Sequence, residues 1–585
     1  MKTENRNVKI VCTLGPATSS LEMITAISDA GMNVARLNFS HGTYESHKAT
    51  VDKVRLVENA ADKPIAVLLD TKGPEIRTGT LAGGGKVTLG DGTKFVLRFD
   101  GSDGDESGVS IDYPSLYKEV AVGQRIFIDD GTIELSVSAM SQTEIACSVV
   151  TGGELGEHKG INVPGADLSV PTLTAKDISD IKWGIENDVD YIAVSFVRTK
   201  DDIMEVRRVL EQYSGDAKVI AKIETKQSVD NIDGIITVAD GLMVARGDLG
   251  VEIPTEDVPM VQKSIIEKCR LQGKPVIVAT QMLDSMIRNP RPTRAEASDV
   301  ANAVIDGTDA VMLSGETAGG LHPVEAVTVM NKIIQRTEKD INLWQRHKDT
   351  LTDSNIIADS VSHAARDIAA SMNAAAVVSL TSSGGTARMV SKYRPGCRII
   401  AATPQRKTWR QLALVWGVLP IFSILSPDLE SSVQTALNVI QGESLVNVGD
   451  NVVITSGVPL GSPGSTNTVY VHTVGQVLAR GHSLVRRVVT GKVCKASSPE
   501  EALNKAVDGN ILVLRESSRD YIHAIERAMA VVTEESGLTS FAGVMTLNLG
   551  LASVFGAAGI FDAVEDGMLI TVDGIRGLVY KGRVG

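Results

Sequence analysis

The sequence predicts an α/β protein built around a (β/α)8 barrel. Eight short apolar stretches, rich in β-branched residues, recur between Lys9 and Thr317, and segments with helical periodicity separate most of them. Apolar runs without polar alternation are typical of strands buried on both faces of a parallel sheet. Strand and helix alternating eight times is the pattern of a closed parallel barrel. The stretches are residues 9–15, 34–40, 65–71, 191–197, 218–224, 241–247, 275–280 and 310–316.

The barrel pattern is interrupted after the third stretch. Between Glu75 and Leu168 the helical period gives way to alternating strands and glycine turns, as in KVTLGDGTKFVLRF and RIFIDDGTIELSVSAM. This predicts a small antiparallel β-domain, residues 75–168, inserted in a strand-to-helix loop. Such loops lie at the catalytic mouth of a barrel, so we expect the insert to act as a lid. The alternative is an insertion that has no role in catalysis.

Two further α/β regions are expected after the barrel, which comprises residues 1–74 and 169–345. Residues 346–474 begin with a helix, a strand (AAVVSLT) and a glycine loop. Residues 475–585 form a second glycine-rich unit that contains ILVLRE, MLITVDG and LVYKG. No apolar run approaches the ~20 residues of a membrane span, and the polar start does not read as a signal peptide. We therefore expect a cytoplasmic protein without membrane contact.

Composition and charge exclude some partners. The 585 residues are 43% hydrophobic and 22% charged, which is ordinary for globular proteins. The net charge of −13 argues against nucleic-acid binding but not against small anions, which respond to the local field of a cleft. The five cysteines lack metal-ligand or disulfide spacing, as expected in a reducing compartment.

Polar residues stand where the predicted strands end, which is where barrel enzymes hold their chemistry. In AKIET, Lys222 and Glu224 are two residues apart and share one face of a strand. Asp248 follows the next strand. Two carboxylates from neighbouring strand ends suit Mg²⁺, and a lysine beside them suits a migrating phosphoryl group or an enolate. A structural Lys222–Glu224 ion pair is the alternative.

Four oxygen-bearing residues with a single formal charge stand at two other strand ends. This set predicts a monovalent-cation pocket, although a hydrogen-bonded turn would use the same residues. They are Asn38, Ser40, Asp70 and Thr71. Arg36 and Arg77 add fixed positive charge of the kind that binds phosphate.

Together these motifs resemble pyruvate kinases. ARLNFSHG, LDTKGPEIRTG, AKIE, ARGDLGVE, VATQML, RPTRAEASDVANAV and DAVMLSGETA occur in this order across the barrel, and the resemblance extends to about Val474. It implies transfer of the phosphoryl group of phosphoenolpyruvate to ADP, which gives ATP and pyruvate in the last step of glycolysis. It also implies Mg²⁺ (or Mn²⁺), K⁺ and a homotetramer.

The resemblance implies a role for each matching residue. Lys222 would stabilise the phosphoryl group in flight and Arg36 would contact it, while Thr280 would lie where enolpyruvate is protonated. Glu224 and Asp248 would hold Mg²⁺, with the backbone of Gly247 and Asp248 at the substrate carboxylate. The K⁺ ligands would be Asn38, Ser40, Asp70 and Thr71, and the nucleotide contacts Asn38, His41, Arg77 and Lys159. Glu75 is typical of members that require K⁺.

The loop TSSGGTAR, which follows a predicted strand and opens a helix, is a candidate effector site. From the residues alone an ordinary helix N-cap is the stronger interpretation, but the resemblance implies that the loop binds the phosphate of an allosteric effector. The residues concerned are Thr381, Ser382, Ser383, Gly384 and Thr386, with residues 457–466 as the facing loop. A sugar monophosphate and a nucleotide are both open as the ligand.

The last region resembles the swivelling domain of phosphoenolpyruvate-utilising enzymes. Phosphotransfer versions carry a histidine after Thr-Ser, but this chain has Phe541, which cannot accept a phosphoryl group. We therefore expect a structural or regulatory role, and regard a relay through His523 or His482 as the weaker hypothesis. For the whole chain, a metal-dependent lyase acting on a pyruvate enolate and a catalytically dead regulatory barrel are the alternatives.

Overall fold

The computed structural model describes residues 6–166, 168–340, 356–426, 428–459, 466–537 and 539–584. The chain divides into two compact units. One contains residues 1–362, 381–422 and 461–464, and the other contains residues 363–380, 423–460 and 465–585. Within the described ranges, no helix combines the length and apolar character needed to cross a membrane.

The predicted barrel is confirmed, because all eight apolar stretches form its parallel strands. The order around the closed barrel is β1-β17-β16-β15-β14-β13-β3-β2. The strands are β1 (Lys9–Thr13), β2 (Val34–Asn38), β3 (Ala66–Asp70), β13 (Tyr191–Val194), β14 (Lys218–Ile223), β15 (Gly241–Ala245), β16 (Val276–Ala279) and β17 (Ala310–Leu313).

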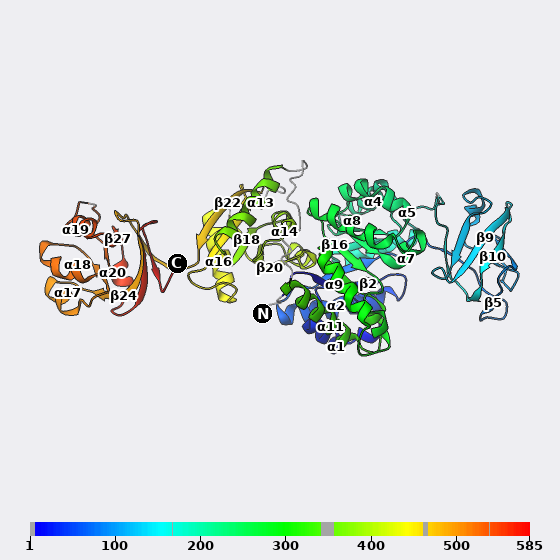
Figure 1. Cartoon of the computed structure of the whole chain (residues 1–585), viewed down its shortest axis with the longest axis horizontal. Helices are drawn as coiled ribbons and strands as arrows, with labels where there is room; N and C mark the ends of the chain where they lie inside the picture. The colour runs from blue at the N-terminus through cyan, green and yellow to red at the C-terminus, as the bar shows by residue number, and fades with distance from the viewer. Residues whose placement is uncertain are drawn as a thin grey trace. The chain divides into compact units, whose positions relative to one another are not determined.

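Helices connect the strands and lie around the outside of the barrel (Figure 1). They are α1 (Leu21–Ala30), α2 (Tyr44–Ala61), α3 (Ala175–Glu186), α4 (Lys200–Gln212), α5 (Lys226–Asp230), α6 (Ile232–Val238), α7 (Arg246–Glu252), α8 (Val258–Leu271), α9 (Arg294–Asp306), α10 (Gly315–Ala318) and α11 (Pro323–Asp340). Side chains such as Val11, Leu68 and Ile220 fill the barrel, together with Ala413 and Leu414 of a short 3-10 helix, η5 (Leu412–Leu414). The barrel is thus a packed core, and its chemistry is confined to its ends.

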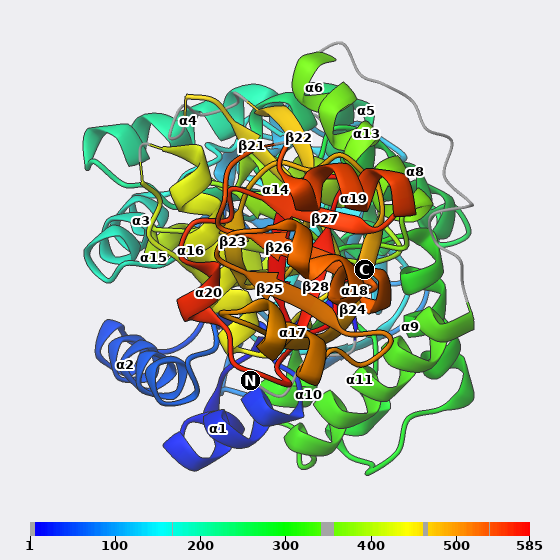
Figure 2. The ribbon, with the colours of Figure 1, turned by 90° about the vertical axis from the view of Figure 1, so that its left-hand side faces the viewer.

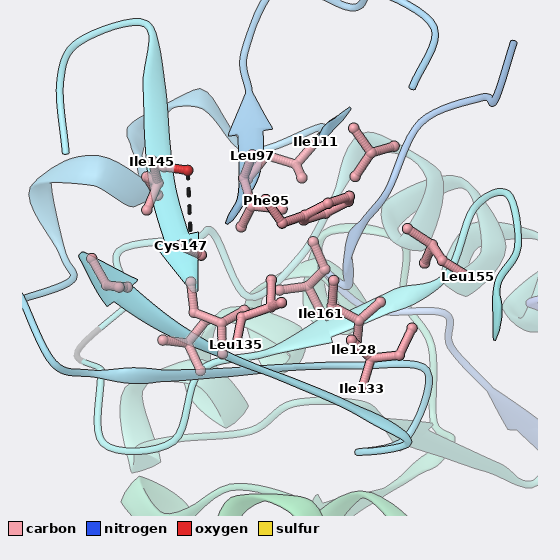
Figure 3. Packing of buried hydrophobic residues seen from close by; sticks show 14 of the residues in the cluster. Phe95, Leu97, Ile111, Ile128, Ile133, Leu135, Ile145, Cys147, Leu155 and Ile161 are labelled. Carbon is pink, nitrogen blue, oxygen red and sulfur yellow. Dashed lines mark hydrogen bonds between the residues drawn. The ribbon is translucent and has the colours of Figure 1, made fainter. Parts of the chain in front are cut away.

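The insert is a β-domain with its own core, shown in Figure 3 around Phe95, Leu97 and Leu135. Its main sheet has the order β4-β12-β8-β9-β10-β6-β7, and β5 pairs separately with β11. All pairs are antiparallel except β6–β7, which is parallel. The strands are β4 (Ile76–Arg77), β5 (Val87–Leu89), β6 (Lys94–Arg98), β7 (Gly108–Ser110), β8 (Arg125–Ile128), β9 (Ile133–Met140), β10 (Glu144–Thr151), β11 (Gly153–Leu155) and β12 (Gly160–Asn162).

The third region also follows its predicted α/β pattern. In the first unit β19 and β20 pair in parallel, and in the second unit β21 pairs in parallel with β18 and antiparallel with β22. The elements are α13 (Ile356–Ser371), β18 (Ala376–Leu380), α14 (Gly385–Lys392), β19 (Arg398–Thr403), α15 (Arg406–Gln411), β20 (Val418–Phe422), α16 (Leu429–Gly442), β21 (Asn451–Gly457) and β22 (Thr466–Thr473).

The last region forms one seven-stranded sheet in the order β23-β29-β28-β24-β25-β26-β27 (Figure 2). Helices α17, α18 and α19 contribute to the core on one face, and α20 contributes to the core on the other. The elements are β23 (Val477–Arg480), β24 (Val488–Lys495), α17 (Pro499–Lys505), β25 (Ile511–Leu514), α18 (Ile522–Arg527), β26 (Ala530–Thr533), α19 (Phe541–Leu549), β27 (Ala552–Phe555), α20 (Ile560–Ala563), β28 (Leu569–Asp573) and β29 (Leu578–Lys581).

Candidate active site

A buried lysine is the centre of the polar cluster at the barrel mouth. Lys222, on β14, donates to Ser195 Oγ at 2.7 Å, and its Nζ lies 2.8 Å from Glu224 Oε1 and 3.2 Å from Asp70 Oδ1. Burial alone would lower the pKa of Lys222, but the two carboxylates raise it above its ordinary value. The side chain is therefore a fixed ammonium group. The ion pair with Glu224 foreseen as an alternative does exist, within a larger cluster.

Arg36 is held beside this lysine by the same aspartate. Its Nε donates to Asp70 Oδ2 at 2.6 Å and its Nη1 donates to Thr13 Oγ1 at 2.9 Å. The Asp70 residue is fully buried, and burial alone would raise its pKa, but the charges of Lys222 and Arg36 hold that pKa below the usual value. Asp70 therefore remains ionised and orients two cations toward the mouth.

Glu224 and Asp248 lie close enough to repel one another. Glu224 is 1% exposed, and its Oε2 accepts a hydrogen bond from the backbone N–H of Phe196 at 2.6 Å. Asp248 lies in the first turn of α7, and its carboxylate has no hydrogen bond or ion pair with any described residue. Burial, followed by the negative charge of Glu224, raises the pKa of Asp248. A divalent cation would relieve this repulsion, so the donor set fits one.

Thr280 occupies a strained position next to this carboxylate pair. Its φ is +64°, a left-handed conformation that β-branched residues rarely adopt and that is often found at functional sites. Its hydroxyl accepts a hydrogen bond from the Gly247 N–H at 2.8 Å and donates to the Ala279 carbonyl at 2.7 Å. Arg246 donates to the Thr280 carbonyl and pairs with both oxygens of Asp299 at 2.7 Å, which fixes this turn.

The register of β2 and β3 brings the four oxygen-bearing residues together. Asn38 and Asp70 are direct partners in this pairing, and Ser40 and Thr71 follow them. The hydrogen-bonded turn considered as an alternative is present, because Asn38 Oδ1 accepts from the Ser40 N–H at 3.1 Å. The Thr71 carbonyl accepts from Ser195 Oγ at 2.7 Å. Several of these oxygens are thus already engaged within the protein.

The insert contributes a second group of charges. Gly160, next to Lys159, pairs with Arg77 across β12 and β4. The Arg77 Nε donates to Glu75 Oε2 at 2.9 Å, and Lys159 Nζ contacts Asp129 Oδ1 at the same distance. His41 lies outside the insert, on the exposed turn after β2. The structure therefore brings Arg77 and Lys159 together, with no described hydrogen bond that joins them to His41.

A cavity of about 310 Å³ opens between the insert and the barrel. It reaches Asp248, and its wall contains four further carboxylates, Glu75, Asp130, Asp230 and Glu252. Burial raises the pKa of Glu252 to about 7, although the hydrogen bond from Asn162 Nδ2 (3.3 Å) opposes this. This bond joins α7 to the β12 strand of the insert.

Sequence reasoning missed Ser195 and Thr13. Both stand at strand ends, Ser195 directly after β13 and Thr13 as the last residue of β1. Ser195 contacts Lys222 and Thr71, and Thr13 contacts Arg36. The strand-end rule that selected Lys222 and Asp70 would have found both, but a lone hydroxyl in an apolar stretch carries little chemical signal.

The predicted effector loop forms a tight turn before α14. The N-cap of α14 is Gly384, with a φ of +80°, rather than Thr381 or Ser382. Thr381 Oγ1 accepts a hydrogen bond from the Gly384 N–H at 3.0 Å, and the Ser382 carbonyl accepts one from Thr408 Oγ1 at 2.8 Å. Ser383 lies within the turn, and Thr386 lies in the first turn of α14. Of the facing loop, residues 460–465 lie outside the described residues.

In the last region the position after Thr-Ser is the start of a helix. Phe541 begins α19, and the Ser540 hydroxyl caps it by accepting from the Gly543 N–H. His523 is exposed on α18 and contacts Glu526, while His482 pairs through its backbone with Phe555.

Known families and relatives match the whole length of the chain. Residues 5–327 match the family described as "Pyruvate kinase, barrel domain", residues 359–472 match "Pyruvate kinase, alpha/beta domain", and residues 506–577 match "PEP-utilising enzyme, mobile domain". The chain is 48% identical to the pyruvate kinase of Geobacillus stearothermophilus and 47% identical to that of Bacillus licheniformis, with 99% of each chain covered.

A solved structure agrees in fold. The crystal structure of a pyruvate kinase from Cryptosporidium parvum superposes with a TM-score of 0.76 at 38% identity, and covers 80% of this chain and 96% of that one. A barrel with a buried ammonium group, a guanidinium group and paired carboxylates at one mouth, under an inserted β-domain, defines a phosphotransferase that uses metal ions. The chain belongs to the pyruvate kinase family. Its activity is that of a pyruvate kinase.

Proposed function

We propose that the cluster around Lys222 is the catalytic centre, where the phosphoryl group of phosphoenolpyruvate passes to ADP. The observation that carries the proposal is the ammonium group of Lys222, fixed within 3.2 Å of Ser195, Glu224 and Asp70. Phosphoryl transfer between two anions requires preorganised positive charge more than covalent catalysis. Lys222 and Arg36 supply that charge without reorganisation, because Asp70 holds both.

Glu224 and Asp248 are the proposed ligands of Mg²⁺ or Mn²⁺, whose chemistry is to neutralise charge on substrate oxygens. The Gly247 N–H and Asp248 backbone would contact the substrate carboxylate once Thr280 releases the Gly247 N–H. Thr280 would then direct a proton, through water, to enolpyruvate. A lyase could share the carboxylate pair, but it would have no use for the buried Asp70–Arg36–Lys222 arrangement.

The proposed K⁺ ligands are Asn38, Ser40, Asp70 and Thr71. Glu75 supports a K⁺ requirement through the resemblance, and here it also orients Arg77. Asn38, His41, Arg77 and Lys159 are the proposed nucleotide contacts, two of which belong to an insert that acts as a lid. Water excluded by that lid could not hydrolyse the phosphoryl group.

Four further features complete the proposal. A phosphorylated effector would bind the 381–386 loop, and the chain would act as a homotetramer in the cytoplasm. We keep the expected boundaries of the barrel (1–74 and 169–345), the insert (75–168), the third region (346–474) and the last region (475–585). The tight turn at Gly384, whose φ of +80° directly precedes α14, supports the effector site.

The test is an assay of pyruvate formation from phosphoenolpyruvate and ADP, coupled to lactate dehydrogenase, with Mg²⁺ and K⁺ present. Lys222→Met should lower kcat by several orders of magnitude and change KM for phosphoenolpyruvate only modestly, because its charge acts mainly in the transition state. Lys218→Met, at the opposite end of the same strand, is the matched control and should keep its activity. A Lys222→Met enzyme that retains most of its kcat would remove this lysine from the mechanism.

A further inference from the structure

A second cavity lies where the third region meets the last region, within one compact unit. Its volume is about 490 Å³. One wall is formed by α16 and β22, and the other by β23, β29 and the turn before β29. Nothing in the catalytic cluster or in the 381–386 loop contributes to it. Its walls contain apolar side chains such as Val433, Val477 and Leu578.

Three aromatic polar side chains in this cavity lack hydrogen-bond partners among the described residues. They are Tyr470 and His472, two apart on β22 and so on one face, and Tyr580 on β29. Tyr580 is only 2% exposed. None of their polar atoms is fully buried without a partner, so these groups are open to water in the cavity, and a ligand could replace that water.

Positive charge enters the same cavity from the opposite wall. Arg576 donates to Thr473 Oγ1 at 2.8 Å, which leaves most of its N–H groups for other acceptors, and the exposed Arg480 also lines the cavity. The pKa of His472 is lowered by burial and then by the charges of Arg576 and Arg480. Asp573 Oδ2 lies 3.9 Å from Arg576 Nη1 and offsets part of its charge, but both arginines act on the imidazole, which favours an anion at this place.

The acidic residues of the cavity are already engaged. Asp428 caps α16 by accepting from the Ser431 N–H at 2.7 Å. Glu430 contacts Arg480 at 3.3 Å, with side chains that are 80% and 69% exposed, so water screens this pair. The contact can open at little cost and would free the Arg480 guanidinium for a ligand.

We propose that this cavity is a binding site for a small organic anion, a phosphate or carboxylate carried on a flat apolar body. Arg576 and Arg480 would hold the anionic group, since guanidinium groups match its planar or tetrahedral oxygens. Tyr470, Tyr580 and the apolar side chains would enclose the body, and the tyrosine hydroxyls would gain acceptors. The ligand would bridge the third and last regions. The site is independent of phosphoryl transfer at the barrel.

Calorimetric titration of the full chain with phenyl phosphate, which combines a ring and an anion, tests the proposal. We expect one site per chain. Inorganic phosphate and phenol should bind more weakly, because the first lacks the ring and the second lacks the anionic group. Arg480→Met and Arg576→Met should each weaken binding about tenfold through the loss of a charge-assisted hydrogen bond. Arg486→Met, an exposed arginine of the same region outside the cavity, is the matched control and should bind like the parent chain.

Three results would overturn the proposal. One is the absence of binding, which would mean that the cavity only holds water. Another is unchanged affinity in Arg480→Met, whose exposed side chain can be replaced without risk to folding, even where Arg576→Met fails to fold. The last is binding that disappears in Lys222→Met or Thr386→Ala but not in the arginine variants, which would place the anion at the barrel mouth or the 381–386 loop.

Discussion

At the scale of single residues, a serine that contributes no charge links several members of the proposed catalytic cluster. Ser195 accepts a hydrogen bond from Lys222 at 2.7 Å and donates its only proton to the Thr71 carbonyl, also at 2.7 Å. Its backbone N–H donates to Thr71 Oγ1 at 3.2 Å. One side chain thus links the ammonium group to a proposed K⁺ ligand, so the two features should respond together when it is removed.

Ser195→Ala should lower kcat about tenfold to a hundredfold, because a lysine displaced by a fraction of an ångström stabilises the transition state less well. It should also raise the K⁺ concentration needed for half-maximal activity, because Thr71 loses its restraint. The measurement is the coupled assay across a K⁺ series at constant ionic strength, with Na⁺ as the replacement cation. The parent chain should be nearly inactive in Na⁺ alone.

The control for this substitution is Ser314→Ala. Ser314 follows β17 in the same barrel, but its hydroxyl contacts none of the catalytic cluster, so both kcat and K⁺ activation should be preserved. A Ser195→Ala enzyme with lowered kcat and unchanged K⁺ activation would separate the lysine from the cation site. Full parent activity in Na⁺ would count against K⁺ altogether.

At the scale of elements, the sequence predicted the strands that are buried on both faces. It missed the features that depend on contacts between residues far apart in the sequence. The eight barrel strands could be read because residues such as Val11 and Ile220 are buried on a two-sided sheet. The two-residue β4 and the parallel β7 have no such pattern. The contact between Asn162 and Glu252 joins residues 90 positions apart, and no local sequence pattern predicts it.

Strand order also explains why the candidate catalytic residues could be found. Lys222 and Asp70 stand at strand ends, and the barrel closure that brings these ends together follows from the fold class. The geometry of Thr280 could not be foreseen, because its left-handed backbone accompanies contacts with Arg246 and Asp299, which belong to other elements. The fold and the charged residues at the strand ends could thus be predicted from the sequence, whereas the strained backbone of Thr280 could not.

The α7–β12 contact makes stability depend on pH. Burial raises the pKa of Glu252 from 4.5 to about 7, so the folded chain binds this proton more tightly than the unfolded chain. The free energy of unfolding should therefore decrease as pH rises from about 4.5 to about 7, by at most about 3 kcal/mol. Glu252→Gln keeps an acceptor for Asn162 and removes the charge, so it should raise Tm at pH 8 and leave it nearly unchanged at pH 4.5.

Scanning calorimetry at both pH values measures this difference. Glu256→Gln, at an exposed position in the turn after α7, is the matched control and should change Tm little at either pH. A Glu252→Gln chain that melts at a lower temperature than the parent at pH 8 would show that the ionised carboxylate stabilises the contact instead.

At the scale of the whole molecule, the candidate catalytic residues and the last region occupy separate parts of the sequence. The candidate catalytic residues, from Arg36 to Thr280, belong to the first compact unit, and the barrel interior is completed by Leu414 of that unit. Among the described residues, the two cores of the last region and the side chains packed against them come from residues 478 to 579. Phe541 begins α19 at the position where phosphotransfer versions of this domain carry a histidine, so we expect no phosphoryl relay through this position.

A chain ending at Val474 should therefore remain an active enzyme, with kcat and KM for phosphoenolpyruvate within about twofold of the full chain, since it loses a region with its own cores. Removal exposes Tyr470 and His472 on one wall of the 490 Å³ cavity, so phenyl phosphate binding should disappear while turnover persists. The coupled assay and the calorimetric titration on the same preparation measure both outcomes. The matched control is a mixture of the two, full-length and shortened, which should show the average turnover. Circular dichroism shows whether the shortened chain folds. If it folds but loses more than tenfold in kcat, the last region must support catalysis by the barrel. The expectation that turnover does not depend on the last region would then be wrong.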